Sequence, residues 1–143
     1  MKSKFMPELL LVLDNEAIQA LSDHSHSKHR RMLAIIERFQ SHLQRGSQAT
    51  VTVPTTVRVE ASINRQDPAA SFVNRIVNND HALDSKTADQ AANLRQQYPY
   101  LSVADAHIAA IAVVDKRDIV IITSDTEDFE ECLSGQNVNI IRI

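Results

Sequence analysis

The alternation of apolar and polar positions along the chain first defines its strands. Continuous apolar runs stand at 9–14 (LLLVLD), 118–124 (DIVIITS) and 138–143 (VNIIRI). Runs of this length are typical of strands that are buried on both faces of a sheet. The segment 50–54 (TVTVP) is a shorter, β-branched strand that a proline ends, and 81–84 (HALD) is a marginal further strand.

Between these strands, apolar residues recur at helical spacing. A short helix is expected over about 15–21, a polar loop over 22–29, and helices over 55–65, 85–97, 102–114 and 126–133. Thr55 or Thr56 would cap the helix at 55–65, and Asp67-Pro68 would start another. The longest helix, over 28–44, would end at Gly46. The apolar positions of the helix over 28–44 are Met32, Leu33, Ile35, Ile36, Phe39 and Leu43. Those of the helix that starts at Asp67-Pro68 are Phe72, Val73, Ile76 and Val77.

Strands that alternate with helices predict a parallel sheet with right-handed crossovers. The expected fold is therefore a three-layer α/β/α sandwich with a central parallel sheet of four to five strands. A chain of 143 residues is long enough to bury one sizeable core, so a single domain over 1–143 is expected.

Composition narrows this picture. Apolar residues make up 43% of the chain and aromatic residues 4%, so the core must be aliphatic. Only two glycines are present, which disfavours all-β folds with many tight turns. The single cysteine, Cys132, cannot form an internal disulfide, which fits a reducing cytoplasm. The apolar run near the start is too short for a signal peptide or a membrane span, so a soluble cytoplasmic protein is expected.

Acidic residues stand where strands give way to helices. Asp14 closes the first apolar run, Asp105 lies in the first turn of the helix at 102–114, and Asp125 follows the strand at 118–124, with Asp128 one turn later. Ligands of parallel α/β sheets bind beyond the carboxyl ends of the strands. Glu60 is a fifth candidate, because its helical spacing from Val57 and Ile63 points it partly inward.

Each acid also has a structural explanation. Asp14 has the position of a helix cap. Ser102 with Asp105 has the spacing of a capping box, as do Ser124 with Glu127 and Asp125 with Asp128. For Glu60, the alternative is a buried salt bridge with Arg58 or Arg65.

Taken together, the acids indicate a site for divalent metal ions. Two carboxylates about 5 Å apart repel each other by about 3 kcal/mol at an effective dielectric constant of 20. Mg²⁺ or Mn²⁺ would remove this repulsion, and such ions support phosphodiester hydrolysis. Asn15, Thr123 and Ser124 are candidates for orienting the substrate or the acids. With a net charge of −3, the protein needs bound cations or a local basic patch to attract phosphate.

The segments VLDNEAI around Asp14, the Glu60 helix after VTVP, LSVADAHIAAIA around Asp105 and VIITSDTEDFE around Asp125 resemble the PIN-domain family, especially the VapC-like ribonuclease toxins. The resemblance implies a PIN-like fold and a Mg²⁺- or Mn²⁺-dependent endoribonuclease. It also implies that Asp14, Glu60, Asp105 and Asp125 are the catalytic, metal-binding quartet and that Asp128 is an accessory metal ligand. An RNA substrate, a cognate antitoxin and a homodimer follow from the same resemblance.

Other interpretations remain open. The protein could be a non-catalytic binding module of the same fold that acts through a protein or RNA partner, or, less consistently with its acids, a phosphate-accepting signalling domain. His24, His26 and His29 could bind a transition metal, although a polar surface loop is the simpler explanation. The densest basic stretch could be a solvated helix face, an RNA-phosphate track or an antitoxin dock, and it comprises Lys28, Arg30, Arg31, Arg38 and Arg45.

Overall fold

The computed structural model describes residues 8–44 and 48–143, and its centre is a five-stranded sheet. All of the strand pairings are parallel, in the order β3-β2-β1-β4-β5. The strands are β1 (Glu8–Leu13), β2 (Gln48–Pro54), β3 (Asn79–His81), β4 (Asp118–Thr123) and β5 (Val138–Arg142). The expected α/β class and parallel sheet are confirmed.

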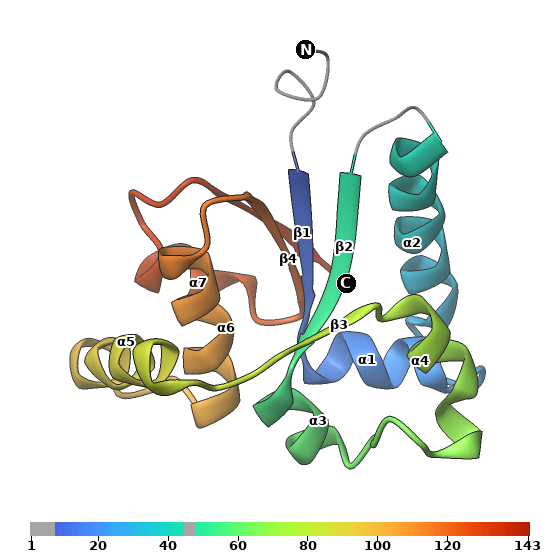
Figure 1. Ribbon diagram of the computed structural model, residues 1–143, viewed down its shortest axis with the longest axis horizontal. Coiled ribbons are helices and arrows are strands. Elements are labelled where there is room, and N and C mark those ends of the chain that lie inside the picture. The colour runs from blue at the N-terminus through green and yellow to red at the C-terminus, as the bar shows by residue number, and fades with distance from the viewer. Residues whose placement is uncertain (1–7, 45–47) are drawn as a thin grey trace.

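Helices cover both faces of this sheet (Figure 1). α5 (Ser85–Gln97), α6 (Val103–Val114) and α7 (Thr126–Cys132) lie on one side, whereas α1 (Asn15–Ser22), α2 (His29–Gln44) and α4 (Ser71–Ile76) lie on the other. α3 (Thr55–Ala61) lies beyond the carboxyl end of β2, at the lower edge of the view. The chain is thus the three-layer sandwich that alternating strands and helices predict.

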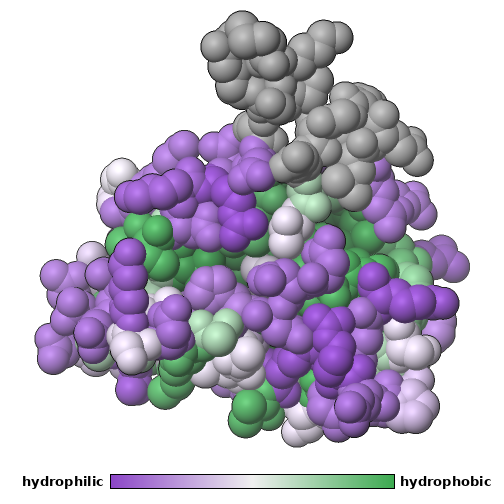
Figure 2. Space-filling view, in the orientation of Figure 1, coloured by the Kyte–Doolittle hydropathy of each residue, from purple (hydrophilic) through white to green (hydrophobic). Residues whose placement is uncertain are grey.

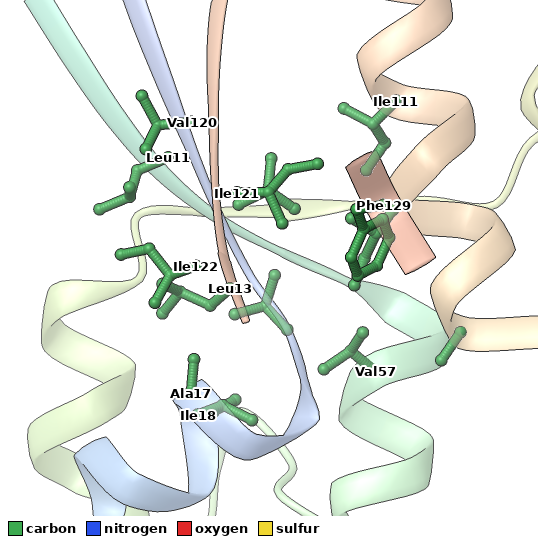
Figure 3. Packing of buried hydrophobic residues seen from close by; sticks show 14 of the residues in the cluster. Leu11, Leu13, Ala17, Ile18, Val57, Ile111, Val120, Ile121, Ile122 and Phe129 are labelled. Carbon is green, nitrogen blue, oxygen red and sulfur yellow. The ribbon is translucent and has the colours of Figure 1, made fainter. Parts of the chain in front are cut away.

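The core is aliphatic, and the two central strands supply its middle. Residues 10–13 of β1 and 121–122 of β4 are fully buried, which explains why these strands read as continuous apolar runs. Register pairs Leu11 with Val120, and both lie on the same side of the sheet in Figure 3. Ile121 points to the other side, toward Ile111 of α6 and Phe129 of α7. Burying each such side chain stabilises the fold by about 2 kcal/mol.

Several expected elements differ in their boundaries or caps. α3 ends at Ala61 because Ser62 adopts a left-handed conformation (φ 57°). No threonine caps α3: Pro54 precedes it without a side-chain bond, so the expected caps were wrong. The strand expected over 81–84 is instead β3, since Asn79–His81 is the stretch that pairs with β2.

The helix expected after Asp67 is two elements, a 3₁₀ turn at Pro68–Ala70 and then α4. Asp67 caps the turn by accepting from the Ala69 N–H at 3.0 Å. Val73 and Val77 are buried as expected, but Phe72 is 37% exposed, with Arg75 over its ring. Gly46 and the side chain of Leu43 lie outside the described residues.

The surface drawn in Figure 2 is mainly hydrophilic, and apolar residues reach it in smaller patches. Within the described ranges, no helix combines the length and the apolar character that crossing a bilayer requires.

Candidate active site

Asp14 is the most buried acid at the carboxyl edge of the sheet. It is 4% exposed, it follows β1 directly, and its carboxylate caps α1 by accepting from the Ala17 N–H at 2.8 Å. Burial raises its pKa from 3.8 to about 6, although hydrogen bonds from Thr123 and Ala17 oppose the shift. Nearby negative charges, chiefly that of Asp125, raise the pKa further. Asp14 is therefore both a helix cap and a member of a group of interacting acids.

Asp105 reaches the same edge from the first turn of α6. Its backbone N–H donates to the Ser102 hydroxyl at 3.0 Å, so the expected Ser102 cap is present. Burial raises the pKa of Asp105 to about 6, and the charges of Asp125, Asp14 and Glu60 raise it further. Acids as far as 91 positions from Asp105 in the chain thus act on its carboxyl group, as the parallel topology predicts.

Asp125 and Asp128 lie on the solvent side of this group. Asp125 is exposed at the end of β4, and its N–H donates to the Thr123 hydroxyl at 2.9 Å. Neither proposed capping device forms here, because α7 starts without a side-chain cap. Asp128 is half-buried, and burial followed by the charge of Asp125 raises its pKa. A cavity of about 260 Å³ beside them is lined by Ser124, Asp125, Thr126, Glu127, Asp128 and Arg142.

Glu60 joins the acids from α3, although not in the expected way. It is exposed rather than turned inward, and it accepts a hydrogen bond from the Asn15 side chain at 3.0 Å. Neither Arg58 nor Arg65 pairs with it, because both bind Asp80. Asn15, directly after Asp14, thus ties Glu60 to the start of α1.

A buried histidine fixes α3 against α6. His107 of α6 is fully buried, and its Nδ1 lies 2.8 Å from the Thr56 hydroxyl of α3. Its Nε2 lies 3.3 Å from Nδ1 of His81 on β3. Burial, and then the charge of His81, lowers the pKa of His107 to about 4, so this imidazole is neutral near pH 7. The contact holds the helix of Glu60 beside the helix of Asp105.

The carboxylate ligands at this edge fit a hard divalent cation, but the carboxylates lie too far apart to hold one as they stand. Within residues 8–44 and 48–143, no salt bridge neutralises Asp14 or Asp105, so their carboxylates lack a cation from the described chain. Carboxylate oxygens are the ligands that Mg²⁺ and Mn²⁺ prefer. No three histidine, cysteine, aspartate or glutamate side chains of the described part come close enough to hold a metal as they stand.

Of the three candidate orienting residues, Thr123 is the most embedded. It is fully buried, its side chain bonds to the Asp14 carboxylate, and its hydroxyl accepts from the N–H of Asp125. Asn15 holds Glu60, and Ser124 lines the cavity. Arg142 of the same cavity was not expected there. A basic residue at the end of an otherwise apolar strand is the signal that could have found it.

The loop histidines serve the α1–α2 connection. His29 is buried with its Nδ1 2.8 Å from the Ala20 carbonyl oxygen, and His26 lies 3.2 Å from Glu16 and accepts from the Lys28 N–H. Among the described residues they form no metal site. From the basic stretch, Arg31 donates to the Arg142 carbonyl at 2.7 Å, whereas Arg45 lies outside the described residues.

Comparison with known proteins gives a fold and no sequence family. No family model matches the chain, and no curated protein matches it. Among eight matching chains of solved structures is one from the crystal structure of VapBC2 from Rickettsia felis bound to a DNA fragment from their promoter. Its TM-score is 0.62 at 11% identity, over 94% of this chain and 98% of that chain. At this identity the likeness concerns the fold alone, and it agrees with the PIN-like fold that the sequence predicted.

Proposed function

We propose that the protein is a divalent-metal-dependent endoribonuclease and the toxin of a toxin–antitoxin pair. The observation that carries the proposal is the shared electrostatics of Asp14 and Asp105, whose pKa values both rise to about 6. Strongly perturbed acids that gather at the ligand-binding edge of a parallel sheet are characteristic of functional sites.

Asp14, Glu60, Asp105 and Asp125 would hold Mg²⁺ or Mn²⁺, with Asp128 as an accessory ligand. A bound cation would supply Lewis acidity toward the phosphodiester and neutralise the carboxylates. The side chains around the acids orient them: Thr123 bonds to Asp14, Ser102 to Asp105, and Asn15 to Glu60. These contacts reduce the freedom of the carboxylates before a cation or substrate binds.

The likeness to a chain of a VapBC2 structure supports the toxin–antitoxin part of the proposal. An antitoxin partner, an RNA substrate and a homodimer are parts of the same proposal. A short neighbouring gene for a DNA-binding protein, whose product copurifies with this chain and suppresses its activity, would support the pairing. An isolated gene with no such partner would remove it.

Cleavage of RNA by the purified protein tests the proposal directly. Single-stranded RNA should be cut in the presence of Mn²⁺ to products with 5′-phosphates, and a chelator should stop the reaction. Asp105→Asn should remove the activity. Asp118→Asn should retain it, because Asp118 is at the start of β4, away from the carboxyl end where the acids gather. Equal activity of the two variants would contradict the role of Asp105, and no cleavage by the wild-type protein would contradict the proposal.

A non-catalytic binding module of the same fold is the second candidate, and the open spacing of the acids favours it. Metal affinity separates the two functions. Calorimetry should detect Mn²⁺ binding that Asp14→Asn weakens if the protein is the enzyme. Absence of any heat at millimolar Mn²⁺ would favour the binding module.

A further inference from the structure

We propose that Arg142 binds a backbone phosphate of the RNA substrate beside the acidic group. This inference rests on the proposed function and names a substrate-positioning residue within it. A cluster of acids repels a polyanion, and the chain has a net charge of −3. RNA therefore needs local positive charge at this edge in addition to any bound cation.

Strand register places Arg142 in line with the acids. Thr123 of β4 pairs with Arg142 of β5, and residues paired in a parallel ladder face the same side of the sheet. That side carries α6 and α7, since Ile121, two residues before Thr123, points toward Ile111 and Phe129 (Figure 3). Thr123 in turn contacts Asp14 and the backbone of Asp125. Arg142 is thus next to Thr123 across the strands, and Thr123 in turn contacts the buried Asp14.

The guanidinium group of Arg142 is held in place, but some of its N–H donors remain available. Its Nη2 donates to the Thr126 hydroxyl at 2.8 Å, and the side chain lines the cavity of about 260 Å³ with Asp125 and Asp128. The side chain remains 60% exposed, and its ion pair with Glu127 spans 4.0 Å to a residue that is 91% exposed. Such exposed pairs are weak. An arginine has five N–H donors in a planar fork, so donors remain for a phosphate.

The backbone of Arg142 is held from two directions. Its carbonyl accepts from Arg31 Nη2 of α2 at 2.7 Å, and the next residue, Ile143, donates its N–H to the Thr123 carbonyl at 3.1 Å. The arginine therefore projects from a fixed strand end rather than from a loose terminus. Arg31 is itself exposed, so a second positive charge lies at the same edge.

Binding of a short, labelled single-stranded RNA, followed by fluorescence anisotropy, tests the inference. Asp14→Asn serves as the parent, so that cleavage does not intervene, and salt is varied in the presence of Mg²⁺. Added to this parent, Arg142→Gln should weaken binding by about tenfold and lower the slope of log affinity against log salt by about 0.7. Arg142→Lys should keep the slope and lose less affinity, because it keeps the charge without the fork.

Lys116→Gln is the matched control, because it removes the same charge from an exposed residue just before β4, at the opposite edge of the sheet. Equal effects of Arg142→Gln and Lys116→Gln on affinity and slope would overturn the inference, and so would no measurable binding by the parent. Thermal melting should show Arg142→Gln to be folded. Failure of the proposed function would instead appear as absence of cleavage by the wild-type protein, while this binding comparison remains readable.

Discussion

Two regions of the molecule handle carboxylates in opposite ways. Asp80 of β3 lies between two arginines, with Arg58 Nε at 2.6 Å and Arg65 Nη2 at 2.9 Å. The same arginines donate to backbone carbonyls at 63, 74 and 77, so the network ties α3 to the segment before β3. Asp14 and Asp105 have no such partner among the described residues. The charges that act on Asp14 and Asp105 are instead those of other acids.

The difference separates an acid that arginines neutralise within the fold from acids that have no salt bridge among the described residues. A carboxylate with arginines on two sides is satisfied by the chain itself. Carboxyls whose pKa values rise through burial and mutual repulsion lower the stability of the folded protein near pH 7, and such a cost is typical of binding sites. The comparison therefore predicts that changes at the two regions will affect different properties.

The largest effect should come from Asp14→Asn, which should lower RNA cleavage by more than about a hundredfold. Loss of even an outer-shell partner of a metal costs about 10- to 100-fold, and Asp14 would be a direct ligand. Asparagine can still cap α1, so the variant should remain folded. Cleavage rates and circular dichroism check the two halves of this prediction, and unchanged cleavage would break the comparison.

Asp80→Asn should do the reverse, with a free energy of unfolding lower by about 3 kcal/mol. The change removes the partner of Arg58, whose side chain is only 10% exposed, and breaking a buried pair leaves its charge uncompensated. Denaturant unfolding measures the loss. Asp89→Asn, an exposed acid on α5, is the control and should change stability little. If Asp80→Asn were as neutral as this control, the arginine network would not be structural.

The pH dependence of stability should show a smaller effect. The folded protein binds a proton at Asp14 more tightly than the unfolded chain, because the pKa rises from 3.8 to about 6. The resulting stability is present at low pH and is lost as the pH rises through about 6. In the presence of a chelator, ionisation of Asp14 alone should lower the free energy of unfolding by about 1 kcal/mol between about pH 5 and about pH 7.

The measurement is the difference in unfolding free energy between wild type and Asp14→Asn at each pH. The difference is needed because His107, whose burial lowers its pKa to about 4, changes stability in the opposite direction. The free energy of unfolding of Asp14→Asn should increase relative to that of the wild type as the pH rises. A constant difference across this range would mean that Asp14 has an ordinary pKa.

Ser102→Ala should have an effect of similar size, a loss of about 1 kcal/mol of stability, because it removes the cap of α6. It should also raise the pKa of Asp105 further, since Ser102 is the group that lowers it. Denaturant unfolding checks the first effect, and the second would appear as weaker Mn²⁺ binding near pH 6. Ser102→Thr should restore both, because threonine retains the hydroxyl group.

Local patterns predicted much of the fold. The helix at Ser85–Gln97 has the bounds that the sequence predicted, β4 and β5 lie within the predicted apolar runs, and β1 begins one residue before its run. These elements could be found because burial on both faces and helical spacing are visible along the chain itself. The caps at Asp14 and Ser102 are also local, involving partners three residues away. The roles of the acids as metal ligands stay predictions.

The sequence by itself determined the order and type of the elements and which acids stand at strand ends, because those properties depend on near neighbours. Only the tertiary structure decided that Arg58 and Arg65 bind Asp80 rather than Glu60, that Glu60 faces solvent, and that Arg142 stands beside Asp125. Such pairings depend on distances set by crossovers and strand register. Coulomb interactions act through space, so they select partners by proximity in the fold and not along the chain.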